Sequence, residues 1–312
     1  MKISTHIAAA NAPELVEGIV DADAAGLDTA WLTVGGVASD PFAVFASAAH
    51  RAERINFGTS IVPTFPRHPL AMAQGAMAVD QLAPGRLKLG VGPSHQPAIE
   101  GTWGIAFKKP LTHLREYVTI LKAVLNEGTV DFHGELLQAH ARIVAPTQVR
   151  VMISALREKA FRLSGELTDG GISWMAPAPY IRDVALPAQL AGAQAAGRPK
   201  PPMIVHTPVV VSEDRALVYE AAKRQFGFYQ RLPYYSQMLQ DAGLEEAAGT
   251  EFSTHMADAL IVSGSETEVA DRVQALPEFG VDEMLAAIVQ LPDDPEAHQR
   301  TLRVLGEIAR QN

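Results

Sequence analysis

The feature that most constrains this chain is an alternation of short β-rich runs with longer helical stretches from one end to the other. Eight runs rich in β-branched and apolar residues are expected as strands, at 3–7, 29–34, 55–62, 87–91, 150–155, 172–175, 203–211 and 283–289. Helical patterns follow them, at 14–25, 41–52, 69–82, 111–125, 157–168, 181–196, 213–242 and 296–309. Strands that alternate with helices pair in parallel, so the chain is predicted to have an α/β fold.

Two stretches depart from this alternation. After the fourth helix, residues 130–144 carry His133-Gly134 near their middle, which is typical of a hairpin or an irregular insertion. Between the seventh and eighth strands, residues 213–242 form a long helical segment with a break near Pro233. Both stretches are expected as additions to a regular core.

The number of strands decides the architecture. Eight βα units close most naturally into a (β/α)8 TIM barrel, which typically takes about 250 residues before insertions. The rival is a doubly wound sheet, but that fold would carry a glycine-rich turn after its first strand, where this chain has AAANAP. We therefore expect one TIM-barrel domain over residues 1–312, with its active site at the C-terminal ends of the strands.

Composition excludes several classes of function. The net charge of −9 argues against binding to nucleic acid or to an anionic membrane. The chain has no cysteine, which excludes disulfides, thiolate nucleophiles and Cys-ligated metal sites. The apolar runs are shorter than the ~18 residues of a membrane span, and MKISTHIAAAN does not resemble a signal peptide. A cytoplasmic protein that acts on a small molecule is expected.

The end of the fourth strand, RLKLGVGPSHQP, looks at first like a dinucleotide-binding turn. Its third glycine is missing, however, and Pro93 has no N–H to donate to a phosphate. The glycines before it allow a ligand to approach closely, and the turn presents Ser94 and His95 at the rim of the barrel. His95 is therefore a catalytic candidate, and the alternative is an ordinary solvent-exposed loop histidine.

Two other strand ends are candidate anion sites. After the third strand, Arg67 and His68 stand at the start of a helix, and a stiff solvated loop is the alternative interpretation. After the fifth strand, Arg157, Lys159 and Arg162 lie in the first turns of a helix, where cations oppose the helix dipole. A bound phosphate is one reason for such a placement, and an ordinary charged surface helix is the other.

Aromatic residues and histidines within the strands have two interpretations. Trp31 and Trp174 either belong to the core or form the wall of a site for a flat ring. His6 and His206, on the first and seventh strands, are placed to meet inside a barrel. Because the strand ends do not obviously supply carboxylates beside these histidines, no metal site is predicted.

Three segments together resemble a known family: GTSIVPTFPRHPLAMAQGAMAVDQLAPGRLKLGVGPSHQ (58–96), PLTHLREYVTILKAVL (110–125) and RLSGELTDGGISWMAP (162–177). The chain resembles the luciferase-like monooxygenase superfamily of flavin and deazaflavin oxidoreductases, and within it the branch that uses coenzyme F420. The resemblance implies a TIM barrel and F420 as the cofactor, with FMN as the alternative. Because members are commonly dimers, it also implies a homodimer.

The resemblance also implies which residues contact the cofactor. A non-prolyl cis peptide bond between Ser60 and Ile61 is expected behind the flavin-like ring, with the end of the fourth strand beside it. Backbone N–H groups after the fifth strand are expected to bind the phosphate, although relatives often have Gly-Pro where this chain has Arg157-Glu158. The cofactor-binding residues predicted in this way are Ser60, Ile61, Gly92, Pro93, Ser94, Ala155, Leu156, Arg157, Gly171 and Trp174.

The departures from the family pattern indicate the direction of the reaction. Alcohol-oxidising relatives carry an Asp-His pair after the second strand, where this chain has Val34-Gly35-Gly36, and an acidic residue where it has His95. A missing base and a present acid favour reduction of a polarised C=C or C=N bond, with His95 as the proton donor. The substrate pocket is predicted at His6, Trp31, Gly35 and Tyr229. An FMN-dependent monooxygenase and a non-catalytic flavin-binding subunit are the alternatives.

Overall fold

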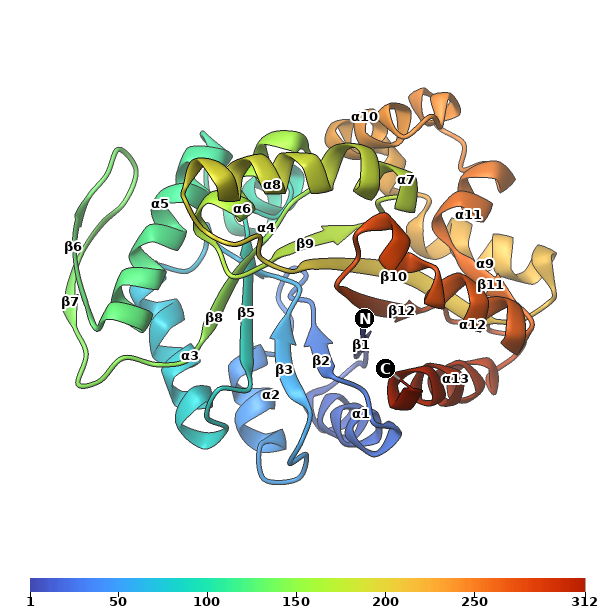
Figure 1. Cartoon of the computed structure of the whole chain (residues 1–312), viewed down its shortest axis with the longest axis horizontal. Helices are drawn as coiled ribbons and strands as arrows, with labels where there is room; N and C mark the ends of the chain where they lie inside the picture. Colours follow the sequence, from blue (N-terminus) through green and yellow to red (C-terminus); the bar gives the residue numbers. More distant parts are fainter. Residues whose placement is uncertain (312) are drawn as a thin grey trace.

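A computed structural model, which describes residues 1–311, confirms the predicted closed parallel barrel (Figure 1). Eight strands form it: β1 (Lys2–His6), β2 (Thr29–Leu32), β3 (Asn56–Thr59), β5 (Leu87–Gly92), β8 (Arg150–Ser154), β9 (Gly171–Trp174), β10 (Met203–Val211) and β12 (Glu283–Ile288). Each strand pairs in parallel with the next in this order, and β12 also pairs with β1. The pairings close the sheet without a free edge, which gives every strand an inner and an outer face.

Helices surround the barrel on its outer side (Figure 1). The α-helices are α1 (Ala12–Ala25), α2 (Pro41–Ala48), α3 (Pro69–Leu82), α4 (Gln96–Trp103), α5 (Pro110–Lys122), α6 (Glu158–Leu167), α7 (Ala178–Tyr180), α8 (Leu186–Ala195), α9 (Arg215–Phe226), α10 (Pro233–Asp241), α11 (Thr254–Leu260), α12 (Glu266–Gln274) and α13 (Ala297–Gln311). Sequence analysis did not anticipate α4, α11 and α12. Within residues 1–311, none of the helices is long and apolar enough to cross a membrane.

The third predicted strand is interrupted. Its first part is β3, and after a break the chain forms β4 (Val62–Pro63), which pairs with β5. The peptide bond between Ser60 and Ile61 at this break is cis, as the resemblance implied. The Ser60 N–H donates to the carbonyl of Leu32 on β2, so the break is held against the neighbouring strand.

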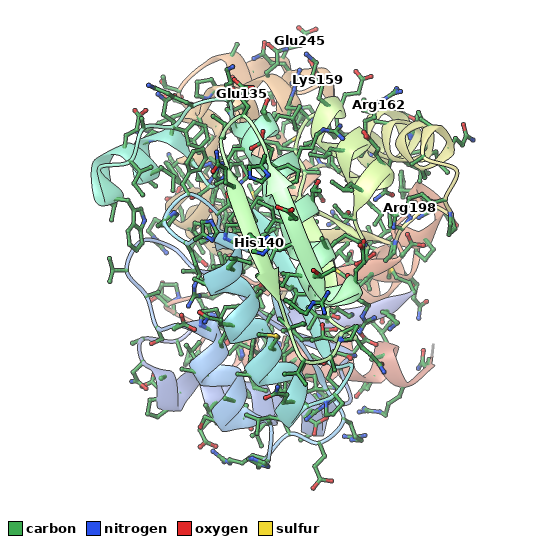
Figure 2. All side chains as sticks on the ribbon, turned by 90° about the vertical axis from the view of Figure 1, so that its left-hand side faces the viewer. Glu135, His140, Lys159, Arg162, Arg198 and Glu245 are labelled. Atoms are coloured by element: carbon green, nitrogen blue, oxygen red, sulfur yellow. The ribbon has the colours of Figure 1, made fainter. Side chains whose placement is uncertain are left out.

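The predicted insertion after the fourth helix is an antiparallel hairpin of β6 (Thr129–His133) and β7 (Gln138–Arg142). It stands apart from the barrel at the left of Figure 1 and faces the viewer in Figure 2, where His140 marks it. The buried carboxylate of Glu116 on α5 accepts N–H groups from Glu135, Leu136 and Leu137 at the hairpin turn. This single side chain fixes the turn to the helical layer.

The predicted helical segment between the seventh and eighth barrel strands is also present, but it is more divided than expected. A 3₁₀ turn, η3 (Tyr229–Arg231), separates α9 from α10, so the break begins before Pro233. A further 3₁₀ turn, η4 (Glu245–Ala248), follows α10, and the short strand β11 (Val262–Gly264) pairs with β10. The segment therefore packs as several short elements, with α10 at the upper edge of Figure 1.

The N-terminal end of the barrel interior is charged and fully paired. The ammonium group of Lys88, which is 1% exposed, donates to Asp28, Thr29 and Glu283 at 2.6–2.7 Å. The other carboxylate oxygen of Glu283 accepts from the hydroxyl of Ser4 and the indole N–H of Trp31. These bonds join β1, β2, β5 and β12 at one level of the barrel.

The charge on Lys88 controls the ionisation of Asp28. Burial by itself would raise the pKa of Asp28, but the Lys88 charge and hydrogen bonds from Lys88, Thr29 and Lys2 outweigh it. The pKa of Asp28 therefore lies well below its usual range, and the carboxylate stays ionised.

An apolar layer lies above this charged layer. It consists of Trp31, Met152, Ile172, Ile204 and Leu285, with Ile61 packed against it. The prediction that Trp31 lines the substrate pocket is therefore wrong, because its side chain is fully buried and its N–H reaches down to Glu283. Trp31 is a core residue that separates the charged layer from the opposite end of the barrel.

Replacement of Lys88 tests the charged layer. Lys88→Met leaves Asp28 and Glu283 buried without their cation, and we expect the free energy of unfolding to fall by about 3–5 kcal/mol. The matched control is Lys2→Met, because Lys2 also pairs with Asp28 but is 54% exposed. That change is expected to cost about 0–1 kcal/mol. Urea unfolding followed by circular dichroism measures both, and equal losses would contradict this role of Lys88.

Candidate active site

The C-terminal end of the barrel interior is lined by rings. His6 ends β1, Trp174 ends β9, and His206 lies on β10 beside Trp174 in the strand register. The His206 ring centroid is 5.4 Å from that of His6 and 4.2 Å from that of Trp174. The predicted meeting of His6 and His206 inside the barrel is confirmed, and Trp174 joins them.

A second group of rings covers the first. Tyr229, on η3, lies 5.5 Å from Trp174, and Tyr235, on α10, lies 5.1 Å from Tyr229 between ring centroids. The ring of His95 contacts both tyrosines, at 6.2 Å from Tyr229 and 5.7 Å from Tyr235. We call the six residues His6, His95, Trp174, His206, Tyr229 and Tyr235 the ring cluster. The structure therefore brings together four of the candidate residues, His6, His95, Trp174 and Tyr229, and adds Tyr235.

The local fold after β5 presents His95 to this cluster. Ser94 has a φ of +62°, which turns the chain sharply at the strand end, and His95 then takes the N-cap position of α4. The His95 side chain does not cap the helix, and its imidazole makes no hydrogen bond to another residue of the described chain. A Cβ on Gly92 would collide with the hydroxyl of Ser154, so this strand end requires glycine.

Burial keeps the ring cluster uncharged. Loss of hydration lowers the pKa of His6 to about 4 and lowers that of His95. It also lowers the pKa of His206 well below its usual range, with a smaller contribution from the neighbouring His6. Loss of hydration also raises the pKa of Tyr229 and Tyr235. At neutral pH the cluster therefore offers neutral hydrogen-bonding groups and ring faces.

The segment after β8 is the predicted phosphate site. The N–H of Ala155 donates to the carbonyl of Ile172 in the barrel, so the prediction that this N–H binds phosphate is wrong. The N–H groups of Leu156 and Arg157 have no such backbone partner within residues 1–311, and α6 begins directly after them without a side-chain cap. The available donors therefore start at Leu156 and continue into the first turn of the helix.

The cations of this helix divide into two groups. Arg157 is half-buried and forms an ion pair with Asp241 at the end of α10, at 2.8 Å. Lys159 and Arg162 are exposed and lie on the outer surface of the molecule in Figure 2. Of the three basic residues noted in the sequence, Arg157 is thus the one that faces the segment between β10 and β12, which carries Tyr229 and Tyr235 and is called the covering segment below. Sequence reasoning missed Asp241, because nothing in the local pattern links α10 to α6.

The remaining candidates lie around the rim or behind it. Gly35 is in an exposed loop with open space where its Cβ would point, and Pro93 is half-buried beside Ser94. Gly171 is buried, its N–H donates to the carbonyl of Pro202, and a Cβ there would meet Ser164 and Gln189. Thr33, which sequence reasoning also missed, donates to the carbonyl of Ser60 at the cis bond.

The other candidate anion site has its donors occupied. Arg67 forms an ion pair with Asp40 at 2.8 Å, and His68 accepts the N–H of Leu70 as the cap of α3. These two residues therefore fix the start of the helix. Among residues 1–311, no group of three or more His, Asp or Glu side chains is arranged to hold a metal ion.

A cavity of about 830 Å³ opens at the opposite, N-terminal end of the barrel. Its lining includes Lys2, Asp28, Lys88 and Glu283, which are already paired with one another. Functional sites of barrels of this kind lie at the C-terminal ends of the strands. We therefore place the candidate active site at the ring cluster.

Comparison with known proteins identifies the family. Residues 2–283 match the family described as luciferase-like monooxygenase, so the chain belongs to this family. The F420-dependent glucose-6-phosphate dehydrogenase of Mycolicibacterium fortuitum is 33% identical over 203 residues, 59% of this chain and 60% of the relative. The 5,10-methylenetetrahydromethanopterin reductase of Methanolobus tindarius is 24% identical over 286 residues, 85% of this chain and 87% of the relative.

A solved structure confirms the fold over the whole chain. An F420-dependent secondary alcohol dehydrogenase in complex with an F420–acetone adduct superposes with a TM-score of 0.82 at 17% identity. The match covers 98% of this chain and 97% of that one. The expectation of an oxidoreductase enzyme is therefore confirmed at the level of the family.

The lowered pKa of His6 predicts how stability changes with pH. Because the folded-state pKa of about 4 lies below the ordinary value of 6.5, the unfolded chain binds the proton first as the pH falls. The contribution of neutral His6 to the free energy of unfolding is fully present above about pH 6.5. It falls by about 3 kcal/mol in total as the pH is lowered to about 4. In His6→Gln the loss of stability over this interval should be smaller by that amount. Urea unfolding at several pH values measures it, with exposed His50→Gln as the control that keeps the wild-type slope.

Proposed function

We propose that the protein is a coenzyme F420-dependent reductase that acts on a polarised C=C or C=N bond of a small organic molecule. The observation that carries this proposal is the ring cluster, in which His95 faces the mouth of the barrel with its imidazole free of hydrogen bonds to the described chain. The relative from Mycolicibacterium fortuitum, whose name states dependence on F420, supports the choice of cofactor.

The residues at the barrel mouth fit a flat ring that carries a phosphate tail. The strand end at Gly92 has no side chain to block a ring, and the N–H groups of Leu156 and Arg157 have no backbone partner in the described chain. Ser60, Ile61, Gly92, Pro93 and Ser94 would contact the ring. Leu156 and Arg157, at the start of α6, would hold the phosphate.

The deazaflavin in its reduced form supplies a hydride, and the chain supplies position and a proton. We assign the proton to a ring nitrogen of His95, because His95 is half-buried and its imidazole is uncommitted. Tyr229 and Tyr235 cover the cluster and limit the access of water. The substrate is proposed to lie between His6, Tyr229 and the loop at Gly35.

The loop after β2 supports reduction over alcohol oxidation. Gly35 and Gly36 provide no side chain that could remove a proton from an alcohol, and Thr33 is engaged with Ser60. The six residues of the ring cluster likewise include no carboxylate that could act as this base. A homodimer and a cytoplasmic location stay predictions from the resemblance and the composition.

Binding of the two cofactors tests the proposal. Titration of the protein should show saturable binding of oxidised F420 and at least about tenfold weaker binding of FMN. Arg157→Gln should weaken F420 binding by about tenfold, because a guanidinium beside a helix N-terminus binds phosphate strongly. The exposed Arg162→Gln is the matched control and should leave the affinity unchanged. Tighter binding of FMN, followed by reaction of its reduced form with oxygen, would instead support a monooxygenase.

The pH profile of reduction tests His95. Burial lowers the pKa of His95, so its proton-donating form should become more abundant as the pH falls below about 6.5. With cyclohex-2-en-1-one as the model acceptor, the rate of the wild type should rise from about pH 8 to about pH 5. His95→Gln should be at least about a hundredfold slower with a flat profile, while still binding F420. An unchanged rate in His95→Gln would remove His95 from the mechanism.

A further inference from the structure

We propose that His206, together with His6 and the indole N–H of Trp174, forms a neutral hydrogen-bonding subsite for the carbonyl oxygen or imine nitrogen of the substrate. This inference rests on the proposed function, because it names the part of the substrate that the same site recognises. It assigns a specificity-determining role to His206. The position of this residue on β10 does not by itself indicate such a role. It also narrows the substrate class to uncharged, unsaturated carbonyl or imine compounds.

The first argument is an unsatisfied buried nitrogen. His206 is 6% exposed, and its Nε2 is buried without a hydrogen-bond partner in the described chain. A buried polar group left without a partner costs about 1–3 kcal/mol, so such groups are rare in folded proteins. The same barrel satisfies Lys88 with three acceptors and Glu283 with three donors at its other end. Of the buried side-chain atoms without a partner in the described chain, those of His206 and Trp174 are the two that lie in the ring cluster.

The second argument is that two buried nitrogens without a partner lie close together, with the ring of His6 beside them. The Nε1 of Trp174 is also buried without a partner, and its ring lies 4.2 Å from that of His206. His6 lies on β1, which β12 separates from β10, and its ring centroid is 5.4 Å from that of His206. The imidazole of His6 makes no hydrogen bond within the described chain. One acceptor atom placed among these groups can accept hydrogen bonds from more than one of them. A single isolated histidine would not provide such a site.

The third argument concerns charge. Burial holds the pKa of both histidines low, so the subsite is neutral at physiological pH. The groups whose rings contact the subsite are Trp174, Phe226, Tyr229 and the two histidines themselves, all of them uncharged there. Burial of a carboxylate or phosphate without a cation is costly, whereas a carbonyl or imine needs one or two donors. The flat walls of Trp174 and Tyr229 further favour a planar substrate.

Binding of matched probes, observed at the histidines, tests the proposal without turnover. The protein is labelled with ¹⁵N-histidine, and each imidazole is assigned with single His→Gln variants. The probes are cyclohex-2-en-1-one, cyclohexene without the carbonyl, and cyclohex-1-ene-1-carboxylate with a negative charge, each with and without oxidised F420. Cyclohexenone should shift the His206 Nε2 signal in a saturable manner, and the other two probes should not.

Variants separate recognition from packing. His206→Phe fills the same space without a donor and should weaken cyclohexenone binding by about tenfold, while His206→Gln should restore it to within about threefold. F420 affinity should stay constant in both variants, and His50→Gln, on the exposed surface, should change neither value.

The outcomes distinguish this inference from the proposed function. Equal cyclohexenone affinity in wild type and His206→Phe, tighter binding of the carboxylate, or no saturable cyclohexenone binding would each overturn the subsite. Absence of F420 binding with an intact cyclohexenone shift at His206 would overturn the proposed cofactor and leave the subsite standing.

Discussion

Closure of the eight-stranded barrel is the constraint on which the rest of the structure depends. It gives each strand one inner face, so interior side chains fall into successive layers along the barrel axis. In the lowest layer, Lys88 joins Asp28, Thr29 and Glu283 and satisfies the buried charges. The apolar layer around Trp31 seals this charged end from the other. His206 and Trp174, each with a buried nitrogen that has no partner in the described chain, lie beyond this layer at the C-terminal mouth.

The character of the site follows from this layering. His6, Trp174 and His206 form its floor, while Tyr229 and Tyr235 reach over it from the segment between β10 and β12. Loss of hydration in this enclosed space makes the histidines neutral. A neutral floor suits an uncharged substrate, and the charged phosphate of a cofactor is left to the start of α6, outside the ring cluster. The Arg157–Asp241 ion pair connects that helix to the covering segment.

Much of the fold could be predicted from the sequence, because the alternation of strands and helices is a local pattern that the closed barrel preserves. The site was predicted less evenly. The local sequence places His6, His206 and His95 on or just after strands, so these residues could be identified as candidates. The burial of Trp31 depends instead on a long-range contact, its hydrogen bond across the barrel to Glu283. Likewise, the use of the Ala155 N–H depends on its pairing with β9, and the role of Asp241 depends on how α10 folds back. Such long-range contacts leave no signal in neighbouring residues.

The most direct test of the central claim is a crystal structure of the protein with oxidised coenzyme F420 bound. The account predicts the deazaflavin ring at the C-terminal mouth, between the Ser60–Ile61 bond and the ring cluster, with its phosphate at Leu156 and Arg157. Electron density for the coenzyme in the N-terminal cavity beside Lys2 and Asp28, or with its phosphate away from α6, would contradict the account.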